Sequence, residues 1–211
     1  MKCGIAVTGR ANPKLIERLA VEAERAGYDY FLVTDHFMLP NSNNHIDVWS
    51  FLPYLAAKTV TLRLGTAVTP ITFRPPGMLA KMAATTDYLS GGRLIVGVGF
   101  GWYRPEFEGY SEWHENRERI AFSLEAIELM RRLWTEPGPV NFNGKYVHAK
   151  SAALEPKPIQ KQLHQFLQPI PNRKLKPHFD GKPRSPSASH PPTLTERQRL
   201  LRQCQMITDR I

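Results

Sequence analysis

The stretch RLGTAVTPITFRPPGMLAKMAATTDYLSGGRLIVGVG, residues 63–99, decides the fold class of this chain. It begins in an apolar run at 62–68 and ends in a second apolar run at 93–99. Between the runs, a Pro-Pro pair predicts the start of a helix that continues to about Leu89, and Ser-Gly-Gly follows as a turn. Two buried strands joined by a helix are typical of a parallel βαβ unit.

The same alternation continues on both sides of this unit. Upstream, apolar runs at 3–7 and 30–34 flank a helix with Asn12 as its N-cap, and 47–57 predicts another helix. Downstream, a long helix is predicted over 115–134, with Leu124 on its apolar face. The sequence therefore predicts four βα units around a parallel sheet. Doubly wound sheets and (β/α)8 barrels both begin in this way, and the local pattern does not choose between them.

Residues 161–211 have a different composition from the rest of the chain. The 211 residues have a net charge of +9, but the first 160 hold 18 basic and 16 acidic residues, a net of only +2. The remaining +7 lies in the Pro-rich segment after Gln160, where no strand-like run recurs beyond Gln162. Its aromatic residues are too few for a typical nucleic-acid surface, so we expect a disordered basic tail and no nucleic-acid partner.

Several classes of protein lack support in the sequence. No stretch approaches the 18 apolar residues of a membrane span, and the apolar run near the N-terminus is too short for a secretory signal. Cys3 and Cys204 are the only cysteines, so a disulfide framework or a cysteine-rich metal site is not expected. P-loop, zinc-protease and serine-hydrolase motifs do not occur. We expect a cytoplasmic protein without a metal or membrane partner.

Candidate functional residues follow the predicted strands, because ligands of parallel α/β folds gather at the carboxyl ends of the strands. A carboxylate, a histidine, small residues and a tryptophan meet there, which suits a flat aromatic cofactor with the histidine as a hydrogen-bond partner or acid/base. The candidates are Asp35, His36, Thr66, Ala67, Val68, Gly99, Phe100, Gly101 and Trp102.

Each candidate also has a purely structural interpretation. His36 could be an ordinary loop residue, and Trp102 could cover the end of the sheet. The GVGFG of 97–101 lacks the dinucleotide-binding spacing, so close packing of a strand against a helix explains it equally well. Arg74 is interpreted as a solvated loop arginine, with phosphate binding as the alternative.

Longer stretches of this sequence resemble a known family. TDHF at 34–37, the run at 63–94, GVGFGWYRPEF at 97–107 and LEPKPIQK near 160 are collinear with the bacterial luciferase-like monooxygenase family. The similarity is greater to the branch that uses the deazaflavin coenzyme F420, and it covers about residues 3–161. The resemblance implies a luciferase-like (β/α)8 TIM barrel with its cofactor at the carboxyl-end rim.

The resemblance also implies roles for the candidate residues. Asp35 and catalytic His36 fall beside the deazaflavin or flavin ring, and 66–68 falls on a bulge where the family often has a non-prolyl cis peptide. Gly99 to Trp102 match the rim of the fourth predicted strand. Related deazaflavin dehydrogenases have an acidic glutamate after these glycines, and Trp102 in that place leaves the proton-donor role unsupported. The implied activity is hydride transfer between coenzyme F420 and a small organic substrate, with an FMN-dependent monooxygenase as the alternative.

Beyond LEPKPIQK the chain departs from the family, which continues with a Pro-Pro-Ile-Trp-type fifth strand and three further βα units. Codons for Gln162 to Leu167, read two bases later, can spell Thr-Pro-Pro-Ile-Phe. We therefore hypothesise a frameshift, with 1–160 as the first four βα units of a truncated barrel and 161–211 as out-of-frame text. An open half-barrel has unpaired edges, so it is expected to form a homo-oligomer or to be an inactive product.

Overall fold

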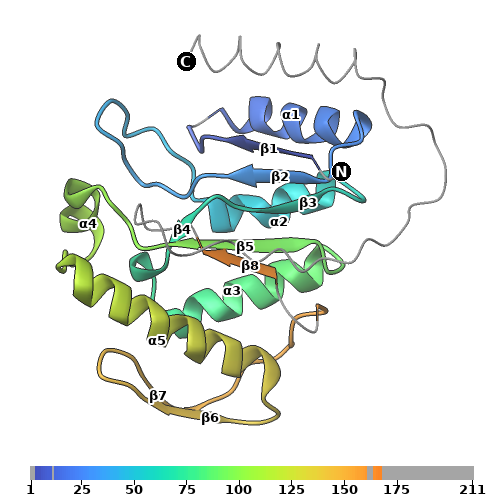
Figure 1. The fold of residues 1–211 in the computed structure, drawn as a ribbon. Helices are drawn as coiled ribbons and strands as arrows, with labels where there is room; N and C mark the ends of the chain where they lie inside the picture. Colours follow the sequence, from blue (N-terminus) through green and yellow to red (C-terminus); the bar gives the residue numbers. More distant parts are fainter. Residues whose placement is uncertain (1–2, 11, 161–163, 168–211) are drawn as a thin grey trace.

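The computed structural model describes residues 3–10, 12–160 and 164–167, and its main feature is a parallel sheet with helices packed along it (Figure 1). The strands of this sheet are β1 (Gly4–Val7), β2 (Tyr30–Val33), β3 (Arg63–Thr66), β4 (Thr69–Pro70), β5 (Leu94–Gly99) and β8 (His164–Leu167). The α-helices are α1 (Pro13–Arg25), α2 (Val48–Lys58), α3 (Pro76–Leu89), α4 (Arg104–Tyr110) and α5 (Asn116–Thr135). A 3-10 turn, η1 (Ile71–Phe73), and an antiparallel pair, β6 (Val140–Asn143) and β7 (His148–Ala152), complete the described elements.

The strands lie in chain order. The sheet runs β1-β2-β3-β5, with β4 and β8 also paired to β5, and every pairing is parallel. Consecutive helices contact one another, α1 with α2, α2 with α3 and α3 with α5. Right-handed crossovers between strands in chain order place α1, α2, α3 and α5 on one face. This is the arrangement of the first strands of a βα barrel, because a doubly wound sheet reverses its strand order and covers both faces.

The two faces of the sheet differ in burial. The in-register residues under the helices belong to the hydrophobic core: Ile5, Val7, Phe31, Val33, Leu64, Leu94, Val96 and Val98. The alternate residues point to the opposite face, where Gly4 and Ala6 of β1 are exposed. All residues of β5 are buried, whereas β1, β2 and β3 each include residues that are exposed or half-buried.

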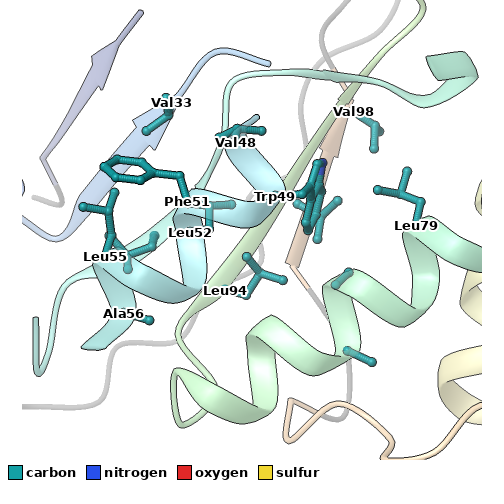
Figure 2. Close-up of a cluster of buried hydrophobic side chains, with 14 of the residues drawn as sticks. Val33, Val48, Trp49, Phe51, Leu52, Leu55, Ala56, Leu79, Leu94 and Val98 are labelled. Atoms are coloured by element: carbon teal, nitrogen blue, oxygen red, sulfur yellow. The ribbon is translucent and has the colours of Figure 1, made fainter. Parts of the chain in front are cut away.

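Helix α2 forms the middle of the core. Its buried face carries Val48, Trp49, Leu52 and Leu55, and Figure 2 shows Trp49 on the side of α2 that faces Leu79 of α3. Pro53 is accommodated inside this helix. Burial of a side chain of this size contributes about 1.5 to 3 kcal/mol, so α2 is fixed to the sheet mainly by its apolar face.

Local signals explain the ends of α1. The side chain of Asn12 accepts a hydrogen bond from the Leu15 backbone N–H, and Pro13 occupies the first turn. Gly27 ends the helix with φ of +72°, a conformation that a side chain would disfavour. The predicted N-cap is confirmed.

Three features differ from the sequence-based expectations. Helix α4 was not predicted, and β8 forms where no strand was expected. Leu124 is exposed, because the buried side of α5 turns toward Ser123, Ala126 and Met130. The expected disordered tail lies outside the described residues, apart from the four residues of β8. None of the helices in the described part of the chain has an apolar stretch long enough to span a bilayer.

Candidate functional site

The candidate site lies where β2, β3 and β5 end. The loop after β2 carries Asp35 and His36, the chain between β3 and β4 carries Ala67 and Val68, and the loop after β5 leads to Trp102. Since neighbouring parallel strands end at the same edge of the sheet, these segments converge there. The segments converge as the sequence predicted, but their side chains differ in burial and in the contacts that they make.

His36 is held by a buried carboxylate that the sequence analysis did not identify. The Nδ1 atom of His36 lies 3.0 Å from Oε2 of Glu106, in the first turn of α4. The other oxygen, Oε1, accepts the backbone N–H groups of Phe37 and Met38 at 2.5 and 3.1 Å. Glu106 is 1% exposed and the His36 side chain is 15% exposed. The imidazole is therefore anchored through one nitrogen at the edge of the site.

Asp35, although adjacent to His36, is buried and forms its contacts inside the protein. Its carboxylate is completely buried and receives both terminal nitrogens of Arg74, at 2.6 and 3.1 Å. Arg74 also reaches Asp47, the N-cap of α2, at 2.6 Å. The side chain of Arg74 is 11% exposed, so the expectation of a solvated loop arginine is wrong, because two carboxylates draw it inward.

A chain of hydrogen bonds joins Asp35 to the core. The hydroxyl of Thr69 donates to Asp35 at 2.8 Å and accepts from the Trp49 indole N–H at 2.9 Å. Complete burial raises the pKa of Asp35, against the opposing effect of the Arg74 guanidinium. For Asp47, burial also acts to raise the pKa, but hydrogen bonds from Ser50 and Arg74 outweigh it and lower the pKa. This network braces the β2 loop against α2.

The backbone between β3 and β4 has the predicted irregularity. The peptide bond between Ala67 and Val68 is cis. Gly65 pairs with Ile95 and Thr69 pairs with Val98, so four steps on one side face three on the other, which is a bulge. The Thr66 hydroxyl is buried and exchanges hydrogen bonds with the backbone of Gly97, whereas Ala67 N–H donates to Val33.

The residues after β5 divide into supporting and exposed groups. The carbonyl of Phe100 accepts from Arg119 at 3.1 Å, and Gly99 pairs with Pro70. Gly101 has φ of +74°, and a Cβ at this position would lie 2.1 Å from the Phe107 ring. A glycine is therefore required there for packing against α4, independently of any ligand.

Trp102 is the exposed member of this group. It is 63% exposed, and its ring lies 6.2 Å from that of His36 in an edge arrangement. The ring of His45 lies 6.3 Å from His36 on the same loop as Asp35 and His36. Burial lowers the pKa of His45, and the electrostatic effect of the neighbouring His36 side chain lowers it further. Within the described ranges, no three His, Cys, Asp or Glu side chains are placed to hold a metal ion.

Sequence reasoning missed Glu106 and His45, and it misjudged Arg74. A signal for α4 was present, because Pro105 followed by Glu106 is typical of a first helical turn. Nothing in the sequence connects Glu106 with His36, since the two lie 70 residues apart and meet only when α4 folds over the β2 loop.

The comparisons with known proteins agree with this geometry. The model of the family described as luciferase-like monooxygenase matches residues 1–172. The chain belongs to this family. The family resemblance in the sequence is thereby confirmed, and the fold is the luciferase-like α/β fold with a parallel sheet.

Individual members of the luciferase-like family are similar over about 70% of the chain. An F420-dependent glucose-6-phosphate dehydrogenase of Segniliparus rotundus is 36% identical over 153 residues, which are 71% of this chain and 45% of that protein. An FMNH2-dependent dimethylsulfone monooxygenase of Pseudomonas putida is 32% identical over 72% of this chain and 42% of its own length. The chain thus spans less than half the length of these two relatives.

Solved structures of the family show the same fold. An F420-dependent secondary alcohol dehydrogenase, in complex with an F420-acetone adduct, superimposes with a TM-score of 0.71 and 27% identity. The match covers 79% of this chain and 52% of the other. The observed sheet therefore corresponds to part of a larger luciferase-like structure.

Proposed function

We propose that this chain is a luciferase-like oxidoreductase that transfers a hydride between coenzyme F420 and a small organic substrate. The observation that carries the proposal is the convergence of the bulge between β3 and β4, His36 and Trp102 at one edge of the sheet. F420-dependent relatives at 36% identity support the choice of cofactor.

The residues at this edge fit a flat ring system. The bulge interrupts the pairing of β3 and β4 with β5, and β5 ends in glycine, so backbone at this edge can approach a planar group closely. Trp102 offers an exposed aromatic surface, and His36 offers a ring nitrogen. Arg74 is already paired with two carboxylates, so we do not assign it to the anionic part of the cofactor.

In this proposal the protein positions the cofactor and the substrate, and the cofactor supplies the redox chemistry. The deazaflavin, when bound, accepts or donates the hydride. Ala67 and Val68 would support one side of the ring through their backbone. Trp102 would exclude water from the exposed side, and His36 would hydrogen-bond a ligand group through Nε2. Asp35 would not touch the ring. It would hold the β2 loop in place through its ion pair with Arg74.

A binding titration of the full chain tests the proposal. We expect quenching of F420 fluorescence on titration with protein, and about tenfold weaker binding for Trp102→Ala. His36→Gln should also weaken F420 binding. Its matched control is His148→Gln, which replaces an exposed histidine on β7 and should bind F420 like the wild type. If F420 binds and is then reduced by a small alcohol, the result supports an F420-dependent oxidoreductase. If neither F420 nor FMN binds, the result contradicts the proposed function.

The second candidate is an FMN-dependent monooxygenase, which the similarity to the FMNH2-dependent relative favours. The same edge of the sheet would hold the flavin ring. Preferential binding of FMN over F420 in parallel titrations would select this candidate. Binding of either cofactor without turnover would instead support the inactive product.

We also propose that the chain acts as a homo-oligomer. Gly4 and Ala6 are exposed on the face of the sheet that carries no helices, and a second copy would cover this face. Light scattering after size exclusion should give at least twice the mass of 24.0 kDa. A monomeric mass at micromolar concentration would contradict this proposal.

A further inference from the structure

Glu106 makes contacts that restrict the chemistry of His36. Oε1 of the carboxylate accepts the backbone N–H groups of Phe37 and Met38, and Oε2 lies 3.0 Å from Nδ1 of His36. The carboxylate is almost fully buried, and its two oxygens are divided between the backbone and the ring. Two backbone N–H donors converging on Oε1 favour the ionised carboxylate, which can only accept hydrogen bonds.

The direction of the hydrogen bond follows from this division. A neutral imidazole carries one N–H, and its other nitrogen is an acceptor. Because Oε2 cannot donate, the hydrogen must lie on Nδ1 of His36. The lone pair then lies on Nε2, for which the described residues provide no hydrogen-bond partner.

We propose that Glu106 is a positioning residue that holds neutral His36 in the Nδ1–H tautomer, so that Nε2 faces the ligand as a hydrogen-bond acceptor. The ligand group recognised by Nε2 is then a donor such as a hydroxyl. The catalytic consequence rests on the proposed function, whereas the tautomer itself does not.

A purely structural role for Glu106 is the competing explanation. By accepting from Phe37 and Met38, the carboxylate also ties the β2 loop to α4. The variant Glu106→Gln separates the two roles. Its single amide oxygen is required by the two backbone N–H groups, so its NH2 group must face Nδ1 and donate to it. The loop contact is then kept, but the hydrogen on His36 moves to Nε2.

Nitrogen-15 NMR of histidine-labelled full-length protein distinguishes the two tautomers, and His36→Asn assigns the signals. We expect Nδ1–H in the wild type at a pH where His36 is neutral, and Nε2–H in Glu106→Gln. Glu108→Gln on the same helix is the control, because Glu108 is exposed and pairs only with Arg104 among the described residues. It should keep the wild-type pattern.

Two outcomes would overturn the proposal. One is an Nε2–H tautomer in the wild type, a measurement that decides the matter even if Glu106→Gln does not fold. The other is an Nδ1–H tautomer that persists in a folded Glu106→Gln protein. Neither experiment uses the cofactor, so failure of the F420 titration would refute the proposed function and leave the tautomer result standing.

Activity provides a further readout in the loaded enzyme. Reversal of the tautomer should lower kcat about 10- to 100-fold, the usual effect of losing a partner that orients a functional histidine. The KM for a hydroxyl substrate should change less, and Glu108→Gln should alter neither. A folded Glu106→Gln protein with the reversed tautomer and full kcat would overturn the catalytic part of the inference.

Discussion

Asp35 and His36 are neighbours in the sequence, yet their side chains enter two different environments. Asp35 is completely buried and bound to Arg74 and Thr69, and no part of it reaches the surface. His36 contacts a carboxylate through one nitrogen and remains partly exposed. The two neighbouring side chains therefore point in different directions, one to the core and the other to the rim of the site.

This difference separates support from ligand contact. Both residues looked equally suited to binding a cofactor in the sequence. The carboxylate at position 35 instead fixes the loop from within, and the imidazole at position 36 is left available. Substitutions in the Asp35 network should therefore change stability first, whereas substitutions at the rim should change binding first.

The largest expected effect comes from Arg74→Met. Removal of the guanidinium leaves Asp35 buried without its cation, and breaking a buried ion pair in this way costs about 3 to 5 kcal/mol. Urea denaturation measures the loss in the free energy of unfolding. Arg104→Met is the control, since its pair with Glu108 is exposed and contributes less than about 1 kcal/mol. Equal losses in both variants would remove the distinction drawn here.

Glu106→Ala should have the next largest effect on stability. It leaves the backbone N–H groups of Phe37 and Met38 without their acceptor in a partly buried place, which costs about 2 to 4 kcal/mol. Thermal and urea unfolding would measure it, with Glu108→Ala as the exposed control. A change below about 0.5 kcal/mol would show that water replaces the carboxylate without cost.

The pH dependence of unfolding tests the charges around Arg74. The pKa of Asp47 is lowered below its ordinary value of 3.8 in the folded protein, so its contribution is present above pH 3.8 and is lost as the pH falls further. Asp47→Asn keeps an N-cap for α2 but removes this titration. The variant should show a shallower loss of stability between about pH 4 and pH 2. An unchanged slope would exclude Asp47 as a source of the acid sensitivity.

The smallest effect on stability is expected for Trp102→Ala. Its side chain is mostly exposed, so the free energy of unfolding should change by less than about 0.5 kcal/mol. Binding of F420 should nevertheless weaken. A large loss of stability would mean that Trp102 belongs to the supporting group rather than to the rim.

The sequence was sufficient to predict the regular part of the fold. The N-cap of α1 at Asn12 and the start of α3 at the Pro-Pro pair both follow from local chemistry. The buried side of α5 was not predictable from apolar spacing. Arg119 is buried on that side because it stacks on Trp113 and bonds the Phe100 carbonyl, and these contacts arise only from the tertiary fold.

The site was predictable in its location but not in its connections. Strand ends identify the rim, and the family resemblance identifies the cis bulge, which the structure contains. The pairing of His36 with Glu106 and of Asp35 with Arg74 joins residues 70 and 39 positions apart. No local pattern encodes such contacts, so Arg74 and Glu106 gained their roles only from the folded chain.

The order of the strands has a consequence for how the protein is made. From β1 to β5, each main strand pairs with the one that precedes it in the chain, so its partner already exists when it leaves the ribosome. Helices α2, α3 and α5 likewise meet the earlier helices α1, α2 and α3 in turn. Assembly can therefore proceed from the N-terminus during synthesis, one unit at a time, without waiting for a distant segment to arrive.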